Sequence, residues 1–452
     1  MLDRLRSRLA DIVRPPQPAR FRRFDAAGGG RRASGFGFFG RTQTEVSSAA
    51  SIVRSRARAL AHNNPFVANA VGNWAGALVG SGIVPAGDAD AVRIWNDWQD
   101  DADADGRTDF AGLQEAVARS LVIDGECFLQ VLTTDAGVRL RLLPAELVDE
   151  SRTIELQGGS YVVSGVEFSA EGDRVAYHVL PVRPTDQFST YAAPVRVPAE
   201  DIIHVMKPIG VGQVRGVSWL APIVVAANEF DAIVDALAVG VKISALHAGF
   251  LTDQNGTGTP FEGDSDLSNV SLEPGTVRRL PPGWDIKFSS PAQAQEVASF
   301  LRFNLQMLAA GLGLPEHLLS GDLTGANYSS LRAGLIPFRQ RVEAIQYNTL
   351  VPQMLRPIWR RVIGFAALGG EIGAVPRVQW LPPKPLQVDP AKDAEATVAE
   401  IAAGLTSRSK AVAERGWSID DLDAEIAADR AREARLGLSF GAPAAKKEVT
   451  DA

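Results

Sequence analysis

The sequence predicts an α+β protein, and three observations support this fold class. The first half of the chain contains short segments in which apolar and polar residues alternate, as strands require, namely CFLQVLT, RLRLLPAELV, YHVLPV and DIIHVM. Helical periodicity precedes these strands over residues 46–80. Farther along, two long helical patterns enclose residues 247–290, a segment rich in Gly, Asp, Ser and Pro that contains the strand-like piece WDIKFS. Strands and helices therefore occupy the same chain in distinct groups.

Composition limits the classes of protein that the chain can be. Its 452 residues are 46% apolar, which is enough to bury a sizeable core in more than one domain. The net charge of −7 argues against a protein that binds nucleic acid over its whole surface. A single cysteine, Cys127, excludes an internal disulfide and a cysteine-based zinc site. The chain contains no uninterrupted stretch of about 18 apolar residues, so the sequence predicts no membrane-spanning helix.

The helical and proline patterns predict the remaining elements in order. The first helix, over residues 46–80, ends at the glycines and proline of GSGIVP. A helix containing Trp95 and Trp98 follows, and then a helix over residues 109–123 that Asp109 caps. Three prolines predict kinks or breaks in a helical region over residues 329–367, namely Pro337, Pro352 and Pro357. A last helical section covers residues 390–436, before a disordered tail at 438–452.

The two long central helices each carry a narrow polar stripe. At 100° per residue, the helix over 218–246 aligns Asn228, Asp231, Asp235 and Lys242, with apolar residues on most of its remaining surface. The second helix begins at a capping box, Ser290-Pro291-Ala292-Gln293. Its stripe contains Gln295, Ser299, Arg302 and Gln306. A thin polar stripe fits a helix packed on both flanks, either in a ring of copies around a channel or in a partly buried core.

The N-terminal segment is strongly basic. Residues 1–58 contain thirteen arginines and four acids, and GGG and PP stand in the same stretch. This pattern predicts a poorly packed arm over residues 1–49, either a solvated tail or a segment that touches phosphates or an acidic partner. Leu2, Leu5 and Leu9 have helical spacing, but Asp3 and Asp11 disfavour a targeting helix.

No motif predicts catalysis or metal binding. The five histidines, residues 62, 178, 204, 247 and 317, form no metal-ligand spacing, and neither a Walker A nor a GxSxG sequence occurs. The loop DADADGRTDFAG (101–112) resembles a calcium loop, but Gly112 occupies the position that needs a bidentate Glu. We therefore expect no metal, no cofactor and no catalytic residue.

The stretch HVMKPIGVGQVRGVSWLAP (204–222) superficially resembles a nucleotide-binding loop. Gly210 and Gly212 fit a GxGxxG fingerprint, but its third glycine would fall on Arg215, and Gly216 comes one residue late. A nucleotide-dependent enzyme is thus the disfavoured alternative. We expect instead that the glycines let the backbone turn and that Ser218 caps the following helix.

Several stretches, taken in order, resemble the portal proteins of tailed bacteriophages, specifically the lambda-type portal family. The resemblance covers residues 50–437 and rests on RARALAHNNPFVANAVGNWAGALVGSGIVP, SLVIDGECFLQV, LLPAELVD, DIIHVMKPIGVGQVRGVSWLAPIV, FSSPAQAQEVASFLRFNLQMLAAGLGLPEHLLSGDLTGANYSSLRAGLIPFR and GLTSRSKAVAERGWSIDDLDAEIAADR. It implies an α+β wing (50–217 and 329–388), two stem helices (218–246 and 291–312) that bracket a β-rich clip (247–290), a tunnel loop (313–328) and a short helical crown (389–437).

The resemblance also implies the function and the partners. Portals form a dodecameric ring at one capsid vertex, through which the terminase pumps double-stranded DNA and from which the DNA later leaves. The implied partners are the terminase large subunit, the head-tail adaptor, the major capsid protein with scaffold, and DNA bound without sequence specificity, but no membrane. The implied location is the virion, and the host cytoplasm during assembly, in a phage, a prophage or a gene transfer agent.

Site residues follow from matching these regions. The two polar stripes would line the channel, where acidic or neutral side chains let DNA slide. The tunnel loop offers Glu316, Asp322, Thr324, Asn327 and Tyr328 as DNA contacts. The clip offers Arg278, Arg279 and Lys287, as partner contacts or as ordinary solvated charges. Gly210, Gly212, Arg215, Gly216 and Ser218 would form the wing–stem joint, with Arg215 at that joint or at a subunit interface. The arm is hypothesised to pack on capsid or scaffold or to lie near packaged DNA.

Overall fold

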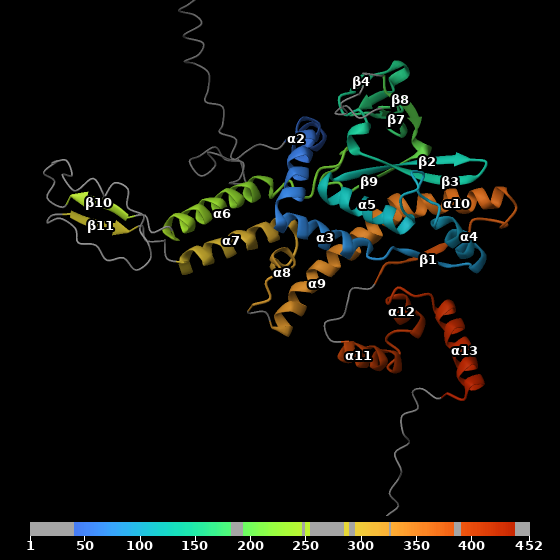
Figure 1. Cartoon of the computed structure of the whole chain (residues 1–452). Helices are drawn as coiled ribbons and strands as arrows, with labels where there is room; N and C mark the ends of the chain where they lie inside the picture. The colour runs from blue at the N-terminus through green and yellow to red at the C-terminus, as the bar shows by residue number, and fades with distance from the viewer. Residues whose placement is uncertain are drawn as a thin grey trace, which may run out of the picture.

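The computed structural model describes residues 40–181, 193–245, 249–253, 284–288, 294–324, 327–383 and 390–438. Within these residues a broad body carries a two-helix stalk that projects from one side and a group of C-terminal helices below it (Figure 1). Helices and small antiparallel sheets occur in separate groups, which confirms the α+β class.

The body is built around a helical layer and a three-stranded sheet. Its helices are α2 (Thr42–Asn63), α3 (Pro65–Val79), α4 (Ala89–Gln99) and α5 (Phe110–Ile123). The sheet has the order β3-β2-β9, from β2 (Glu126–Thr134), β3 (Gly137–Leu143) and β9 (Ile202–Met206). Both neighbours pair antiparallel with β2, whose alternate residues enter the main core. The main core also contains an aromatic cluster of Trp95, Trp98, Phe110, Trp359 and Trp380.

A second sheet forms a smaller lobe with its own core. Its order is β4-β5-β6-β7-β8, from β4 (Ile154–Glu155), β5 (Tyr161–Val163), β6 (Val166–Phe168), β7 (Arg174–Val179) and β8 (Val195–Pro198). Short 3-10 turns at η2 (Ala145–Leu147), η3 (Gln157–Gly159) and η4 (Ala199–Asp201) connect the strands. Phe128 and Tyr177 join this core from the two sheets, with ring centroids 5.8 Å apart.

The stalk consists of α6 (Val224–Ala245) and α7 (Ala294–Leu312), with the hairpin β10 (Gly249–Asp253) and β11 (Trp284–Phe288) at its far end (Figure 1). The short helix α8 (Glu316–Ser320) follows α7. A long helical run then crosses the body as α9 (Tyr328–Ile345), the π-helical segment η6 (Gln346–Leu355) and α10 (Arg356–Leu368). β1 (Val84–Gly87) pairs with β12 (Val378–Leu381), and α11 (Pro390–Ala402), α12 (Arg408–Ala413) and α13 (Ile419–Leu436) complete the chain.

Two predicted boundaries were wrong. The helix over 46–80 is two helices, because Asn64 has extended backbone angles before Pro65 and its side chain caps α3. The first stalk helix begins at Val224 and not at Ser218, since residues 218–223 form successive turns. Kinks or breaks were expected at the prolines of 329–367. The run stays helical, but it changes to a π-helix over Gln346–Leu355, a segment that contains Pro352. The predicted cap of α5 is confirmed, as the Asp109 carboxylate accepts from the Gly112 N–H at 2.8 Å.

Candidate functional site

The base of the stalk is anchored in the core of the body. Six apolar residues at this end of the stalk are buried. They are Ile223, which directly precedes α6, Ala227 and Phe230 of α6, and Leu308, Ala309 and Leu312 of α7. The Trp74 ring packs edge-on against Trp219 and Phe338, at centroid distances of 5.3 and 5.0 Å, and its indole N–H donates to the Leu312 carbonyl. The stalk therefore leaves the body in a defined direction.

The polar stripe of α6 is exposed along its length. Asn228, Asp231, Asp235 and Lys242 all lie on the surface, on the side nearly opposite the less exposed Ile233 and Leu237. Asp231 differs from the other stripe residues in being bound to the body, because its Oδ1 accepts a hydrogen bond from Asn64 Nδ2 at 2.7 Å. Asn64 is itself buried and caps α3, so this contact ties the base of the stripe to the body.

Exposed valines border the α6 stripe on both flanks. At helical spacing, Val225 and Val239 fall on one flank and Val234 and Val241 on the other. Between 40% and 68% of each of these side chains is accessible. An apolar surface of this kind on both sides of a polar stripe is unusual for a chain that acts alone.

The surface of α7 combines a polar stripe with an apolar row. Ser299, Arg302 and Gln306 are exposed, as expected for the stripe. Gln295 lies in α7, but the structure does not describe its side chain. Beside them, Phe300, Phe303 and Met307 are 50%, 64% and 44% exposed. Our sequence analysis did not single out this apolar row, although the spacing of three and four residues was readable.

The loop after α7 is more structured than a free loop. Residues 316–320 form α8, and Asn69 and Asn73 of α3 donate to carbonyls of Leu318 and Leu319. The predicted tunnel loop (313–328) therefore contains a short helix, which α3 holds in place through two amide donors four residues apart.

Among the candidate DNA contacts in this loop, several polar groups already have local partners. Asp322 accepts from the backbone and hydroxyl of Thr324, and these hydrogen bonds lower the pKa of its carboxyl. Asn327 caps α9 through a capping box with Ser330. Glu316 lies in the first turn of α8, and Tyr328 opens α9. These contacts set the loop's shape and leave Leu323, 59% exposed, at its surface.

The joint between β9 and the stalk contains a buried ionic cluster, which we define as Arg54, Glu126, Glu150, His204 and Arg215. The Arg215 guanidinium binds Glu126 with both Nε and Nη2, at 2.9 and 2.7 Å, and reaches Glu150 at 3.1 Å. It also donates to the carbonyls of Ala145, Val148 and Ser164.

Arg215 is 1% exposed, and its side-chain hydrogen bonds go to the body. Of the two alternatives predicted for this residue, these contacts fit the joint and not a subunit interface, because folding encloses the side chain within one chain.

Glu126 is the acceptor at the centre of this cluster. Its side chain is fully buried and accepts from Arg215, Arg54, His204 and the Gly216 backbone. Burial raises the pKa of this carboxyl, but Arg215 and His204 outweigh burial and hold the pKa well below its usual range. Sequence analysis missed Glu126; a charged residue at the start of a buried strand was the available signal.

The surroundings of His204 favour its neutral form. Burial lowers its pKa, and the contact to Glu126 offsets this only in part. The 3.0 Å bond to Glu126 Oε2 requires a proton on Nε2. In the neutral form Nδ1 is an acceptor, and this buried atom has no partner among the described residues. The ring stacks on Phe128 at 4.2 Å, so the cluster is shielded on that side.

The glycines of the joint serve different purposes. Gly212 has a φ of +80°, which glycine adopts without strain. Gly216 instead permits a close approach, since a Cβ there would lie 2.4 Å from the Gly125 carbonyl oxygen. A Cβ on Gly210 would meet Thr42 of α2. Ser218 does not cap α6; its hydroxyl accepts from Leu220 N–H in the preceding turn, because α6 starts six residues later.

The remaining predicted site residues give no described side-chain contact. Lys287 lies in β11 opposite Phe250, and Arg278 and Arg279 lie outside the described residues.

The loop at 101–112, which resembles a calcium loop, is held by hydrogen bonds of its own. Asp103 accepts from the backbone N–H groups of Asp105, Arg107 and Thr108. In the described part of the chain, no group of three or more His, Cys, Asp or Glu residues is placed to hold a metal ion. None of the described helices combines the length and apolar character that crossing a bilayer requires.

Comparisons with known proteins point to one family. The family model described as "Phage portal protein, lambda family" matches residues 30–346. A protein of Halomonas phage phiHAP-1 described as "Probable portal protein" is 26% identical over 355 residues, which is 74% of this chain and 68% of that protein.

Solved structures with a similar chain include a gene transfer agent particle and a phage portal protein. A chain from the neck of a native gene transfer agent particle, computed with C12 symmetry, has 20% identity and a TM-score of 0.48, over 84% of this chain and 95% of the other. An HK97 family phage portal protein from Corynebacterium diphtheriae has 12% identity and a TM-score of 0.33, over 63% of this chain and 85% of the other.

Proposed function

The chain belongs to the lambda family of phage portal proteins, and from this membership we propose that copies of it form a ring-shaped channel at one vertex of a capsid. Double-stranded DNA enters through this channel during packaging, driven by the terminase large subunit, and leaves through it later. The head-tail adaptor then binds the same ring. The ring is dodecameric, belongs to the virion, and assembles in the host cytoplasm on the major capsid protein. The same role serves a phage, a prophage or a gene transfer agent.

The stalk is the observation that carries this proposal. Exposed valines on both flanks of the α6 stripe, and the row of Phe300, Phe303 and Met307 on α7, need partners that exclude water. Neighbouring copies of the stalk meet this need by a head-to-tail contact that closes into a ring. The polar stripes then border the lumen.

The charge of the stripes fits the passage of DNA. The acids Asp231 and Asp235 balance the bases Lys242 and Arg302, so the two stripes together carry no net positive charge. Asn228 and Gln306 are neutral. Lysines and arginines in their place would release counterions and bind DNA tightly, in a salt-dependent way. The chain itself needs no catalytic residue for this role, because the terminase supplies the motor.

Ring formation tests the proposal directly. Mass photometry and negative-stain images of the purified full-length chain are expected to show closed rings. Phe303→Asp is expected to lower ring affinity by about ten- to a hundredfold, because a buried aromatic side chain contributes about 1.5–3 kcal/mol. The matched control is Gln306→Asp, one turn away in the polar stripe, which is expected to leave rings intact. A chain that stays monomeric under all conditions contradicts the proposal.

A second experiment addresses the stripes. Asp235→Lys adds a ring of positive charge and is expected to reduce the DNA packaged per particle without changing ring assembly. Gln306→Lys tests the α7 stripe in the same assay. Unchanged packaging in both variants would show that neither stripe faces the DNA.

A further inference from the structure

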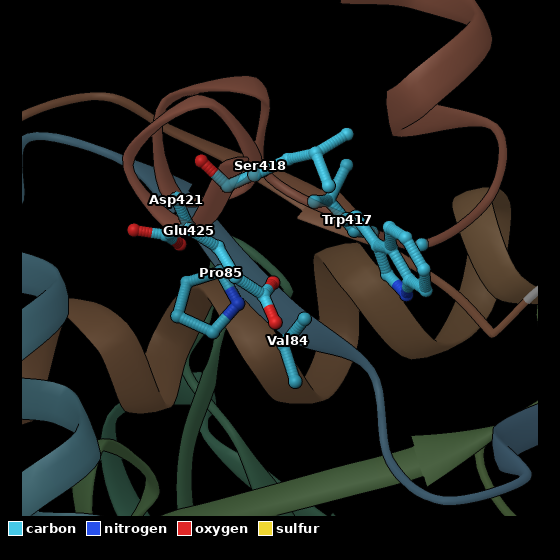
Figure 2. Close-up of a pocket in the computed structure, with 9 residues that line it drawn as sticks. Val84, Pro85, Trp417, Ser418, Asp421 and Glu425 are labelled. Carbon is cyan, nitrogen blue, oxygen red and sulfur yellow. The ribbon is translucent and has the colours of Figure 1, made fainter. Parts of the chain in front are cut away.

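A long groove separates the C-terminal helices from the body. It consists of three adjoining cavities of about 280, 560 and 180 Å³, which share Leu381, Trp417 and Ser418 at one end and Glu343, Tyr347 and Glu414 at the other. One wall is β1, β12 and the junction of α9 with η6, and the other wall is α12 and α13. We call this feature the C-terminal groove. Figure 2 shows one end of it, with Val84 and Pro85 opposite Asp421 and Glu425.

The groove presents an apolar surface that the chain leaves open. Trp417 is 58% exposed and lines the same cavity as Val84, Pro85 and Leu381. α13 has no buried residue, and the described C-terminal helices bury only Ala411 and Val412. These helices therefore lie against the body without filling the space between, and an indole that could be buried stays in contact with solvent.

The groove is also acidic. Its carboxylates belong to Glu343, Glu414, Asp420, Asp421 and Glu425, and none of them has an ion pair with another described residue. The only cations along the described walls are Lys410 and Arg339. The excess of negative charge acts on Tyr347, whose pKa is raised by burial first and then by Glu343 and Glu414. An occupant of this groove should be basic and carry apolar side chains.

The N-terminal arm of the chain has this chemistry. Residues 1–39 contain nine arginines and three aspartates, together with Leu2, Leu5, Leu9 and five phenylalanines. Thirty-nine residues ahead of Gly40 can extend by up to about 130 Å, which is enough to reach a groove on the same chain or on a neighbouring copy. A nucleic acid has the wrong charge for the groove, and a polar acidic segment would be repelled.

We propose that the C-terminal groove is the docking site of the basic N-terminal arm, with arginines on the groove carboxylates and an apolar side chain of the arm against Trp417. Docking covers the exposed indole and offsets the unpaired carboxylates. It ties the first residues of the chain to its last helices, so that the arm couples the N-terminus to the position of α12 and α13.

Photo-crosslinking in the full-length chain tests this proposal. Trp417 is replaced by p-benzoylphenylalanine, which its 58% exposure should tolerate. After irradiation, cross-linked peptides are identified by mass spectrometry, and we expect them to come from residues 1–39. The matched control places the same probe at Leu405, which is 78% exposed in the connection between α11 and α12 and outside the groove, where no cross-link to the arm is expected. Mixing ¹⁴N and ¹⁵N chains distinguishes an arm of the same chain from that of a neighbour, and either result supports the proposal.

A charge variant provides the second test. Asp421→Asn with Glu425→Gln is expected to lower the cross-link yield about three- to tenfold, as the loss of two partly exposed ion pairs predicts. Asp135→Asn with Glu371→Gln, which changes exposed carboxylates outside the groove, should leave the yield unchanged. Cross-links from Trp417 to C-terminal helices of a second copy, an absence of cross-links, or equal yields in the two double variants would overturn the proposal. These results do not depend on whether the ring transports DNA.

Discussion

The joint in the body and the stalk treat charged and apolar side chains in opposite ways. At the joint, Glu126 is completely buried and its partners Arg215, Arg54 and His204 come from three other segments of the same chain. On the stalk, Asp235 and Arg302 face solvent, and so do Phe303 and Val241. The joint is thus complete within one chain, whereas the stalk has surfaces that only partners can cover. Stability should depend on the first region and assembly on the second.

The largest effect is expected from breaking the buried ionic cluster. Arg215→Met removes the main partner of Glu126 and the guanidinium donors to three buried carbonyls. Removing one partner of a buried pair costs about 3–5 kcal/mol in the free energy of unfolding. Chemical denaturation of the monomer measures this loss. Arg93→Met, an exposed arginine of α4, is the control and should stay within about 0.5 kcal/mol; equal effects would contradict our description of the joint.

A smaller loss is expected where two chain segments cross in the joint. Gly216→Ala places a Cβ 2.4 Å from the Gly125 carbonyl oxygen, and backbone must move to accommodate it. Overpacking of this kind costs about 2–3 kcal/mol. Gly72→Ala in α3, where nothing lies within 4 Å, should instead stabilise the chain by about 0.5–1 kcal/mol. The two alanine variants are compared by denaturant midpoint, and a common sign would refute the close approach.

Acid should weaken the joint through His204. The pKa of this histidine is lower in the folded chain than in the unfolded chain, so the unfolded state binds more protons as the pH falls. Stability is fully present above the unfolded pKa of about 6.5 and declines below it, by up to about 1.4 kcal/mol per pH unit. Glu126, whose folded pKa is also lowered, acts in the same direction at lower pH.

Denaturation curves at pH 7.5 and 5.5 check this dependence. His204→Gln keeps a donor for Glu126 but does not titrate, and it should flatten the change between the two pH values. His62→Gln, at the exposed end of α2, should leave the change as it is. A pH dependence that survives in the His204 variant would assign it to other groups.

The smallest effect is expected on the stalk. Asp235→Asn removes a solvent-exposed charge with no described ion pair, so the free energy of unfolding should change by no more than about 0.5 kcal/mol. The same denaturation assay measures it beside Arg215→Met. A loss near that of the arginine variant would mean that the stalk is not the open region described above.

Local signals predicted much of the fold. Alternation placed β2, β3, β7 and β9, periodicity placed α4 and α5, and Asp109 marked the start of α5 because its cap is a contact over three residues. Errors occurred where a local pattern was compatible with two outcomes. Pro65 could stand inside a bent helix or start a new one, and Ser218 could cap a helix or a turn.

The polar stripes of the stalk could be predicted because helical spacing alone decides which side chains share a face. The side chains of these stripes are exposed, as the narrow polar faces had indicated. Arg215 was not predictable in the same way. Its partners Glu126 and Glu150 lie 89 and 65 residues away, and no local pattern records such distances.

Periodicity, capping and ordered motifs are local properties, and they were enough to predict the α+β class, the two stalk helices with their stripes and the family resemblance. The folded chain was needed to find that Arg215 is buried in the body, that α3 holds α8, and that an acidic groove lies between β1 and α13. Burial, charge pairing and empty space depend on which distant segments meet, and that is a property of the folded chain as a whole.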